Sequence, residues 1–224
     1  MTASRREFLE RLTAGAVVSA GVTSAFPDLG QGTPVVQGQE VWDVVWPSKI
    51  VGSHRAVFDA TEIEDGAPLL RAHVWRSQYL QFLKVAATDL TPVLVIRHNA
   101  IPLAMSQEFW DKYHIGEVKK VKHPFTEAPL TKNPILMTAE SGDLPKPMAE
   151  FNLAGLLKVG GVVLACNLAL NDCASTIAKA DKVDPGEARK RALAMLNPGV
   201  ILQPSGVFAT ILAQENGCQY LRAS

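Results

Sequence analysis

The stretch Lys158–Leu170, with the sequence KVGGVVLACNLAL, decides the fold of this chain. Its apolar run Val162–Ala165 follows a glycine pair and leads directly into Cys166, after which the apolar spacing becomes that of a helix. A buried strand that passes into a helix is typical of an α/β domain, so we expect Cys166 at the carboxyl edge of a sheet, where ligands and reactive groups collect. The N–H groups and positive dipole end of the following helix favour thiolate over thiol.

The rest of the chain alternates in the same way between short apolar runs and helical segments. Further strands are expected at Arg55–Asp59, Val93–Ile96, Val200–Leu202 and Gln219–Arg222. Helices are expected after Asp65-Gly66, over Pro102–Met105, Gln107–Tyr113 and Met148–Lys158, after Cys166, from Asp184-Pro185 to Asn197-Pro198, and from Ser205-Gly206 to Gln214. This alternation predicts a doubly wound α/β fold, a three-layer sandwich around a mainly parallel five-stranded sheet.

Composition and length agree with one globular domain. The chain has 224 residues, of which 47% are hydrophobic and 20% charged, so we expect a packed core rather than disorder. Lysine plus arginine and aspartate plus glutamate number 22 each, so the chain lacks the basic charge that nucleic-acid binding needs. We divide it into residues 1–25, a signal; 26–53, a linker and N-terminal arm; and 54–224, the α/β domain, with an irregular insertion at about 116–147.

The first residues resemble an export signal. Ser4-Arg5-Arg6-Glu7-Phe8-Leu9 has the paired arginines of a twin-arginine signal, and the weakly apolar run Leu12–Ala25 ends in a small-residue cleavage site. These features predict recognition by the Tat translocase, a mature chain that begins near Phe26 and a periplasmic location. The run is too short and too weakly apolar for a lasting membrane anchor. The alternative is a basic amphipathic helix at an ordinary N-terminus.

Two segments lack a clear pattern. Val41–Trp46 is expected to be an edge strand or an arm laid on the domain, with Trp42 and Trp46 as apolar anchors. Residues 116–147 contain five prolines and a cluster of lysines. We interpret the lysine cluster as a solvated face. A long irregular loop of this kind is usually a lid, a subunit contact or a mobile insertion.

A second polar group follows the strand Val93–Ile96. Because parallel strands end at the same edge of a sheet, Arg97 and His98 are expected near Cys166. A cation stabilises a neighbouring thiolate, and a histidine can exchange a proton with it. A Cys and His pair also begins a nucleophilic site, for which Asp59 and Asn99 are candidate orienting groups. The alternative is that Arg97 is a surface ion-pair partner and His98 a hydrogen-bonded loop residue.

Three stretches together resemble the DsrE/DsrF-like family in its exported, twin-arginine branch. They are LVIRHNAI at 94–101, VLACNLAL at 163–170 and PSGVFATILAQENGCQYL at 204–221, and the likeness covers about residues 54–224. The resemblance implies a reactive cysteine that carries a persulfide, at the position of Cys166, and a homo-oligomer. Many members have no established activity. The export signal, the insertion and two further cysteines distinguish this chain from the sulfur-relay members.

The three cysteines leave several arrangements open. Cys166 and Cys173 lie about two helical turns of ~5.4 Å each apart, too far for a disulfide in a regular helix. Cys173 could pair with Cys218, or all three could be small buried hydrophobes. A mixed metal site of Cys166, His98 and a carboxylate is also open, although the sequence contains no metal-binding, nucleotide-binding or serine-hydrolase motif.

No cofactor is expected, and the sequence leaves open whether the chain is an enzyme. Two functions of different classes remain. The first is sulfur handling through a catalytic group of Cys166, His98 and Arg97, with small sulfur species as ligands. The second is a non-catalytic exported module for ligand binding or assembly, in which Cys166 is buried.

Overall fold

The computed structural model describes residues 42–224, which form one compact unit. Within this range five strands form a single sheet, in the order β4-β3-β2-β1-β5, and every neighbouring pair is parallel. The strands are β1 (His54–Ala60), β2 (Leu90–Ile96), β3 (Val162–Cys166), β4 (Val200–Gln203) and β5 (Gln219–Arg222). The α/β class and the five-stranded parallel sheet predicted from the sequence are confirmed.

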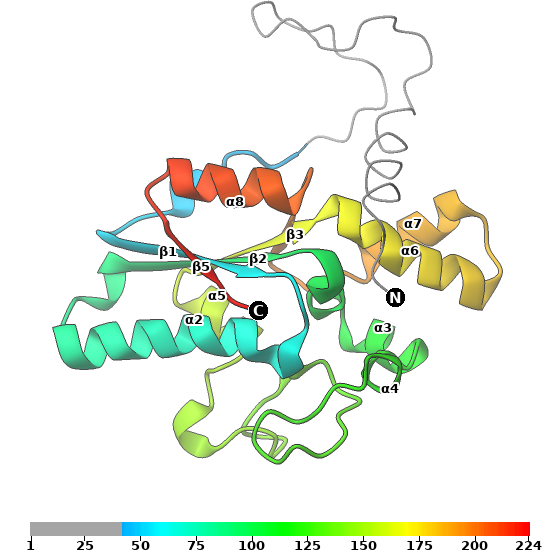
Figure 1. Cartoon of the computed structure of the whole chain (residues 1–224), viewed down its shortest axis with the longest axis horizontal. Helices are drawn as coiled ribbons and strands as arrows, with labels where there is room; N and C mark the ends of the chain where they lie inside the picture. The colour runs from blue at the N-terminus through cyan, green and yellow to red at the C-terminus, as the bar shows by residue number, and fades with distance from the viewer. Residues whose placement is uncertain (1–41) are drawn as a thin grey trace, which may run out of the picture. The chain divides into compact units, whose positions relative to one another are not determined.

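Helices cover both faces of the sheet, which gives the three layers of the sandwich (Figure 1). The α-helices are α2 (Ala67–Gln78), α3 (Gln107–Lys112), α4 (Ile115–Lys119), α5 (Leu153–Lys158), α6 (Asn167–Asp181), α7 (Pro185–Ala194) and α8 (Gly206–Glu215). Short 3₁₀ helices are η1 (Trp46–Lys49), η2 (Glu64–Gly66), η4 (Ala87–Asp89), η5 (His98–Ala104), η6 (Pro134–Leu136) and η7 (Lys146–Met148), and η3 (Tyr79–Leu83) is a π-helical turn that continues α2. Helix α8 lies on one side of the sheet, and α2 and α5 lie on the other (Figure 1).

Side chains of the central strands alternate between two apolar cores. Along β2, Leu94 and Ile96 join the larger core, which includes residues of α2, α5 and α6, whereas Val93 and Val95 join a smaller core beneath α8. This alternation with a period of two is expected of a strand that is buried on both faces. The larger core closes the α2 side, and the smaller core closes the α8 side.

Strand β2 begins three residues earlier than the sequence suggested. Thr91-Pro92 was expected to end the connection before the strand, but Pro92 lies within β2, opposite Ala56 of β1. Pairing between β2 and β3 begins only at Val93. The proline therefore lies where β2 has a single partner strand, so its missing N–H leaves no gap between β2 and β3.

Two helices are shorter than predicted. The helix expected over Met148–Lys158 begins only at Leu153, because the side chain of Asn152 caps it by accepting a hydrogen bond from the N–H of Gly155 at 2.8 Å. Helix α7 is capped by Asp184 as expected but ends at Ala194, before Asn197-Pro198. The carboxylate of Glu187 binds Arg191 instead of completing a capping box.

The N-terminal arm packs on the α8 side and contains no strand within the described residues. Trp42–Val45 has no regular structure, and Trp46 is fully buried in the smaller core. Its indole N–H donates to Oε1 of Gln203 at 2.9 Å, and Nε2 of Gln203 donates to the carbonyl of Asp43 at 2.7 Å. Because Gln203 ends β4, these bonds attach the arm to the carboxyl edge of the sheet.

Buried residues in the middle of the insertion, residues 116–147, hold it against the domain. Asn133 is fully buried, and its side-chain N–H group donates to the carbonyls of Leu103 and Met105. Ile135, two residues later, belongs to the larger core. These contacts hold the middle of the insertion against the α2 side of the domain.

Candidate functional site at the carboxyl edge of the sheet

The polar side chains of the candidate site follow the ends of neighbouring strands. Arg97 directly follows β2, and Cys166 ends β3. The register pairs Ile96 with Ala165. Arg97 and Cys166, one residue further along, therefore occupy equivalent positions at the ends of adjacent strands. The register also pairs Cys166 with Gln203 of β4, which places the arm's anchor beside the cysteine.

Arg97 is held by a buried carboxylate. Its Nε and Nη2 atoms donate to Oδ1 and Oδ2 of Asp59, both at 2.7 Å, and Asp59 is only 1% exposed. The hydroxyl of Tyr220 donates to Oδ2 of the same carboxylate at 2.9 Å. The hydrogen bonds to Asp59 raise the pKa of Arg97, and they outweigh the opposing effect of its partial burial. Arg97 is therefore a fixed cation at the end of the strand next to that of Cys166.

The first turn of α8 lies against the stem of Arg97. A Cβ atom on Gly206 would lie 2.5 Å from both Cβ and Cδ of Arg97, closer than van der Waals contact allows. The hydroxyl of Ser205 caps the helix by accepting from the N–H of Phe208 at 3.0 Å. The start of α8 and the guanidinium stem are thus packed together, which requires glycine at position 206.

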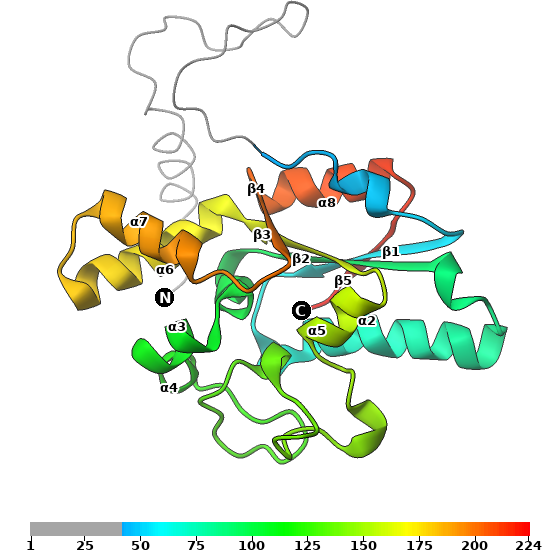
Figure 2. The same cartoon turned by 180° about the vertical axis from the view of Figure 1, so that it is seen from behind.

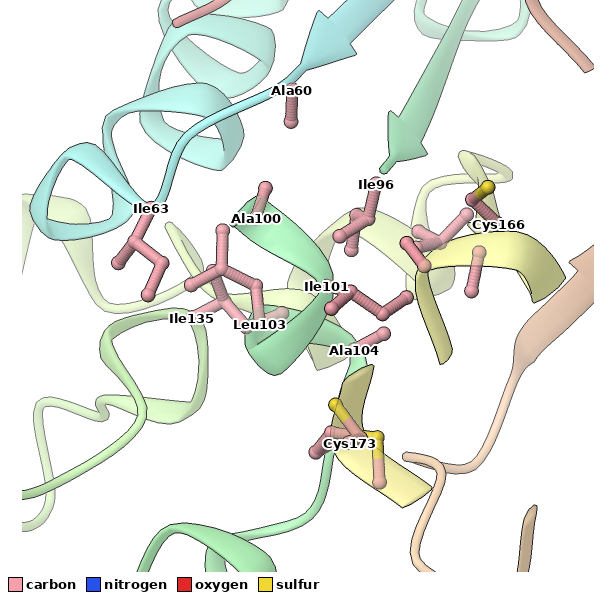
Figure 3. Packing of buried hydrophobic residues seen from close by; sticks show 14 of the residues in the cluster. Ala60, Ile63, Ile96, Ala100, Ile101, Leu103, Ala104, Ile135, Cys166 and Cys173 are labelled. Atoms are coloured by element: carbon pink, nitrogen blue, oxygen red, sulfur yellow. The ribbon is translucent and has the colours of Figure 1, made fainter. Parts of the chain in front are cut away.

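Cys166 is the junction between β3 and α6. Its thiol is free, and the residue is 6% exposed. It immediately precedes the first residue of α6, where helix N–H groups and the helix dipole favour negative charge. The residue is buried and belongs to the larger core, although in Figure 3 its sulfur points away from Ile101 and Ala104 of that core. The position predicted from the sequence, at a strand end and a helix start, is the one observed.

His98 is exposed to solvent and lies in the left-handed region, with φ of 55°. Within residues 42–224 its ring makes no hydrogen bond or ion pair. Neither candidate orienting group contacts it: Asp59 binds Arg97, and the side chain of Asn99 donates to Glu62 at 3.0 Å. The structure brings Arg97 and Cys166 together, but it provides no contact that would make His98 and Cys166 a catalytic pair.

The other two thiols are shielded from chemistry. Burial raises the pKa of Cys173 to about 12 and that of Cys218 to about 11, so neither forms a thiolate at neutral pH. Cys173 belongs to the larger core and Cys218 to the smaller one, on opposite sides of the sheet. The disulfide between them that the sequence left open is not formed. Cys166 ends β3 and Cys173 lies within α6, and their sulfur atoms are separate in Figure 3.

Neither a metal cluster nor a membrane-spanning helix occurs in the part of the chain that the structure describes. No group of three or more His, Cys, Asp and Glu side chains there could hold a metal ion, so the mixed site of Cys166, His98 and a carboxylate is not assembled. No helix between residues 42 and 224 has the length and apolar character needed to cross a membrane.

Three contributors to the site were not identified from the sequence. Tyr220, Gly206 and Gln203 lie far from Arg97 and Cys166 along the chain. Tyr220 was interpreted only as a strand residue and Gly206 as part of a helix start, and Gln203 was not interpreted, since the strand was expected to end at Leu202. Each of them lies within or next to a predicted strand or helix start. No motif marks them, so only their position in those elements could have pointed to the site. Their roles depend on the order of strands in the sheet.

Comparisons of the chain with protein-family models, curated proteins and solved structures found no match. The resemblance to the DsrE/DsrF-like family stays a prediction from the sequence.

Proposed function

We propose that this chain is an exported DsrE-like protein that handles sulfur through Cys166. The single observation that carries the proposal is a free thiol at the carboxyl edge of a parallel sheet, at a helix N-terminus and within electrostatic reach of Arg97. The other two thiols lack such an environment, because burial raises the pKa of each well above neutral pH.

The proposed step is transfer of one sulfane sulfur from a low-molecular-weight persulfide, R–S–SH. The sulfur of Cys166 attacks the outer sulfur of the donor, a new S–S bond forms, and the donor's S–S bond breaks. The donor leaves as the thiol R–SH and takes up the proton that Cys166 loses, so no external oxidant or reductant is needed. Arg97 favours the thiolate that attacks and the persulfide anion that results. His98, exposed beside Arg97, is proposed to line the route by which the donor arrives.

Intact mass after incubation with an organic persulfide tests the proposal. We expect a mass increase of one sulfur atom that reverses with a thiol reductant. The increase is lost in Cys166→Ser and kept in the matched controls Cys173→Ser and Cys218→Ser. In Arg97→Gln the gain should be slower, because the cation closest to the attacking sulfur along the sheet edge is removed. No gain in the unmodified chain, or a gain that persists in Cys166→Ser, would refute the proposal.

A second candidate function is a non-catalytic binding or assembly module. It is favoured by the bidentate ion pair, because Asp59 neutralises much of the charge that Arg97 offers to Cys166, and by the 6% exposure of Cys166. If persulfides and small thiol reagents leave Cys166 unmodified in the folded state, this second function is the one to retain.

We also propose export through the Tat translocase to the periplasm, from the paired arginines Arg5 and Arg6, which lie outside the described residues. Replacing both by lysine should leave the chain in the cytoplasmic fraction of the cell. Arg11→Lys, in the same segment but outside the pair, should not. Equal export of both variants would remove the support for this location.

A further inference from the structure

The insertion contains a single histidine, His123, and both of its ring nitrogens have hydrogen-bond partners. Its Nδ1 atom accepts from the N–H groups of Phe125 and Thr126, at 3.2 and 3.3 Å. Its Nε2 atom lies 3.0 Å from the carbonyl oxygen of Asp143. A ring nitrogen that accepts N–H groups carries no proton, so these partners assign the proton to Nε2, which donates to Asp143. This set of bonds therefore requires a neutral ring.

The two bonds to Nδ1 form a turn that resembles a helix cap. In His123-Pro124-Phe125-Thr126 the side chain accepts from the N–H groups two and three residues further along the chain. Asp184 does the same at the start of α7, where its Oδ1 accepts from Gly186 and Glu187 at 2.9 and 3.1 Å. Carboxylates in general titrate near pH ~4, whereas histidines change charge between about pH 5 and 8. The turn at His123 is thus capped by the kind of acceptor that a modest fall in pH removes.

The loop that carries this turn has a base and a tip that are held separately. The insertion lies on the α2 side of the domain (Figure 2). At the base of the loop, Lys122 and Pro129 form an antiparallel bridge, and the N–H group of His123 donates to the carbonyl of Ala128 at 2.8 Å. No backbone hydrogen bond from another described residue reaches the tip, residues 124–126. The ring of His123 is therefore what holds the tip.

Phe125 at the tip forms one wall of a small hollow between the insertion and the start of α2. Leu144 lines the hollow from the insertion, and Leu69 lines it from α2. The two walls of the insertion meet at one ring, because Nδ1 of His123 binds the N–H group of Phe125 while Nε2 binds the carbonyl of Asp143, the residue before Leu144. Phe125 is 41% exposed and Leu144 only 6%, so Phe125 is the wall that can move.

We propose that His123 is a pH-sensitive latch, which holds the tip of the loop over the hollow when its ring is neutral and releases the tip when its ring is protonated. An imidazolium ring has two N–H donors and no acceptor, so no orientation of the ring can keep the bonds from Phe125 and Thr126. The bond to Asp143 persists, because Nε2 donates in both states. The closed tip is therefore favoured at higher pH and lost as the pH falls, while Leu144 stays in place.

The charged groups near His123 do not compete for this role. They are Lys122 and Glu127 in the loop, Lys132 and Asp143 in the rest of the insertion, and Asp65 of η2, which accepts from the N–H group of Lys122. Lys132 and Asp143 pair with each other at 2.5 Å. Although desolvation opposes the shift, hydrogen bonds from Lys132 and Ser141 lower the pKa of Asp143. Carboxylates and lysines in general titrate outside the range from about pH 5 to 8, so the histidine is the group that changes charge there.

Amide hydrogen exchange of the full chain, followed by NMR at about pH 7.5 and about pH 5.5 and corrected for the intrinsic pH dependence of exchange, tests the latch. Two hydrogen bonds together change the equilibrium between closed and open tip by about tenfold or more, so the protection of the N–H groups of Phe125 and Thr126 should fall by that factor at the lower pH. The N–H group of Leu130 bonds to the carbonyl of buried Val121 at 2.9 Å and should keep its protection.

Two variants separate the latch from a general loosening in acid. His123→Asn supplies an acceptor oxygen that does not titrate, so the protection of the two N–H groups should be equal at both pH values. His114→Asn is the matched control, with the same change at an exposed histidine just before α4, and it should keep the tenfold fall.

A second measurement needs no variant and remains decisive if His123→Asn fails to fold. In the unmodified chain, the amide shifts of Phe125 and Thr126 and the ring shifts of His123 should follow one titration curve. Nuclear Overhauser contacts between the ring of Phe125 and the methyl groups of the hollow should weaken along the same curve. Equal protection at both pH values, separate titration curves, unchanged Overhauser contacts or a pH dependence that survives in His123→Asn would overturn the proposal. Loss of the pH dependence in His114→Asn would overturn it as well.

Discussion

The two sides of the sheet differ in how they are covered. On the α2 side, α2, α5 and the anchored insertion bury a large apolar core that includes Cys173. On the α8 side, one helix and an arm fastened by Gln203 cover a smaller core, and the polar group of Asp59, Arg97 and Tyr220 lies at its end. The polar group that supports the proposed chemistry therefore lies at the end of the thinner layer, whereas Cys166 itself belongs to the larger core.

Of the variants that test this difference between the two sides of the sheet, Asp59→Asn is expected to change stability most. The change leaves the guanidinium of Arg97, 28% exposed, without its carboxylate partner. Breaking a buried ion pair from one side is costly, so unfolding should become easier by about 3 kcal/mol in urea titrations. The control is Glu150→Gln, which breaks the exposed ion pair to Lys158 and should change stability little. Equal effects of both variants would mean that the polar end of the α8 side is not structurally special.

A smaller effect is expected from Gly206→Ala. The new methyl group would overlap Cβ and Cδ of Arg97, so the helix start or the arginine must move. Overpacking of this kind costs about 2 kcal/mol, to be measured as a shift in the urea midpoint with an unchanged slope. Gly186→Ala, in the first turn of α7, is the matched control. There the nearest atom is an oxygen of Asp184 at 3.1 Å, and the change should be neutral or slightly stabilising. A neutral Gly206→Ala would show that α8 does not hold Arg97.

The smallest effect concerns the α2 side, where His73 is buried against Phe151 and bonds through Nε2 to the carbonyl of Asn152 at 3.0 Å. Burial lowers the pKa of His73 below its usual 6.5, partly offset by the bond to Asn152 and with a smaller lowering by the charge of Arg76. The unfolded chain therefore binds a proton at this position when the folded chain does not. The contribution of neutral His73 to the free energy of unfolding should be full above about pH 6.5. It should fall as the pH drops toward the pKa of the folded state, by less than about 1.4 kcal/mol per pH unit.

Urea unfolding at several pH values checks this, with the difference between the unmodified chain and His73→Gln isolating one histidine from the others. The loss of stability on acidification should be smaller in His73→Gln. An identical pH dependence in both chains would mean that the α2 side admits a proton as easily as the unfolded chain does.

Local pattern predicted many of the elements with accurate limits. The strands β3, β4 and β5 begin at the predicted residues, and the caps at Asp184 and Ser205 start α7 and α8, because capping and apolar alternation act over a few residues. The extent of the helix after Met148 was wrong, since Asn152 caps it four residues further on. The prediction that Pro92 precedes the strand was also wrong. β2 tolerates this proline because its pairing with β3 begins only at Val93, which the sequence alone does not show.

The candidate site was predicted in part for the same reason. Strand ends are a local feature, so Arg97 and Cys166 could both be placed at the carboxyl edge. The carboxylate that holds Arg97 and the hydroxyl that supports it come from β1 and β5, which neighbour each other only because the last strand crosses to the far edge of the sheet. His98 was expected near the thiol, but its left-handed backbone leaves it exposed without a contact to Cys166.

The sequence by itself determined the layered α/β fold and the placement of a cysteine between a buried strand and a helix, because both follow from spacing within about ten residues. Only the tertiary structure decided that Asp59 binds both Arg97 and Tyr220, and that Cys173 and Cys218 lie on opposite sides of the sheet. The physical reason is that strand order and helix orientation depend on how distant segments bury their apolar surfaces together, which the local sequence pattern does not specify.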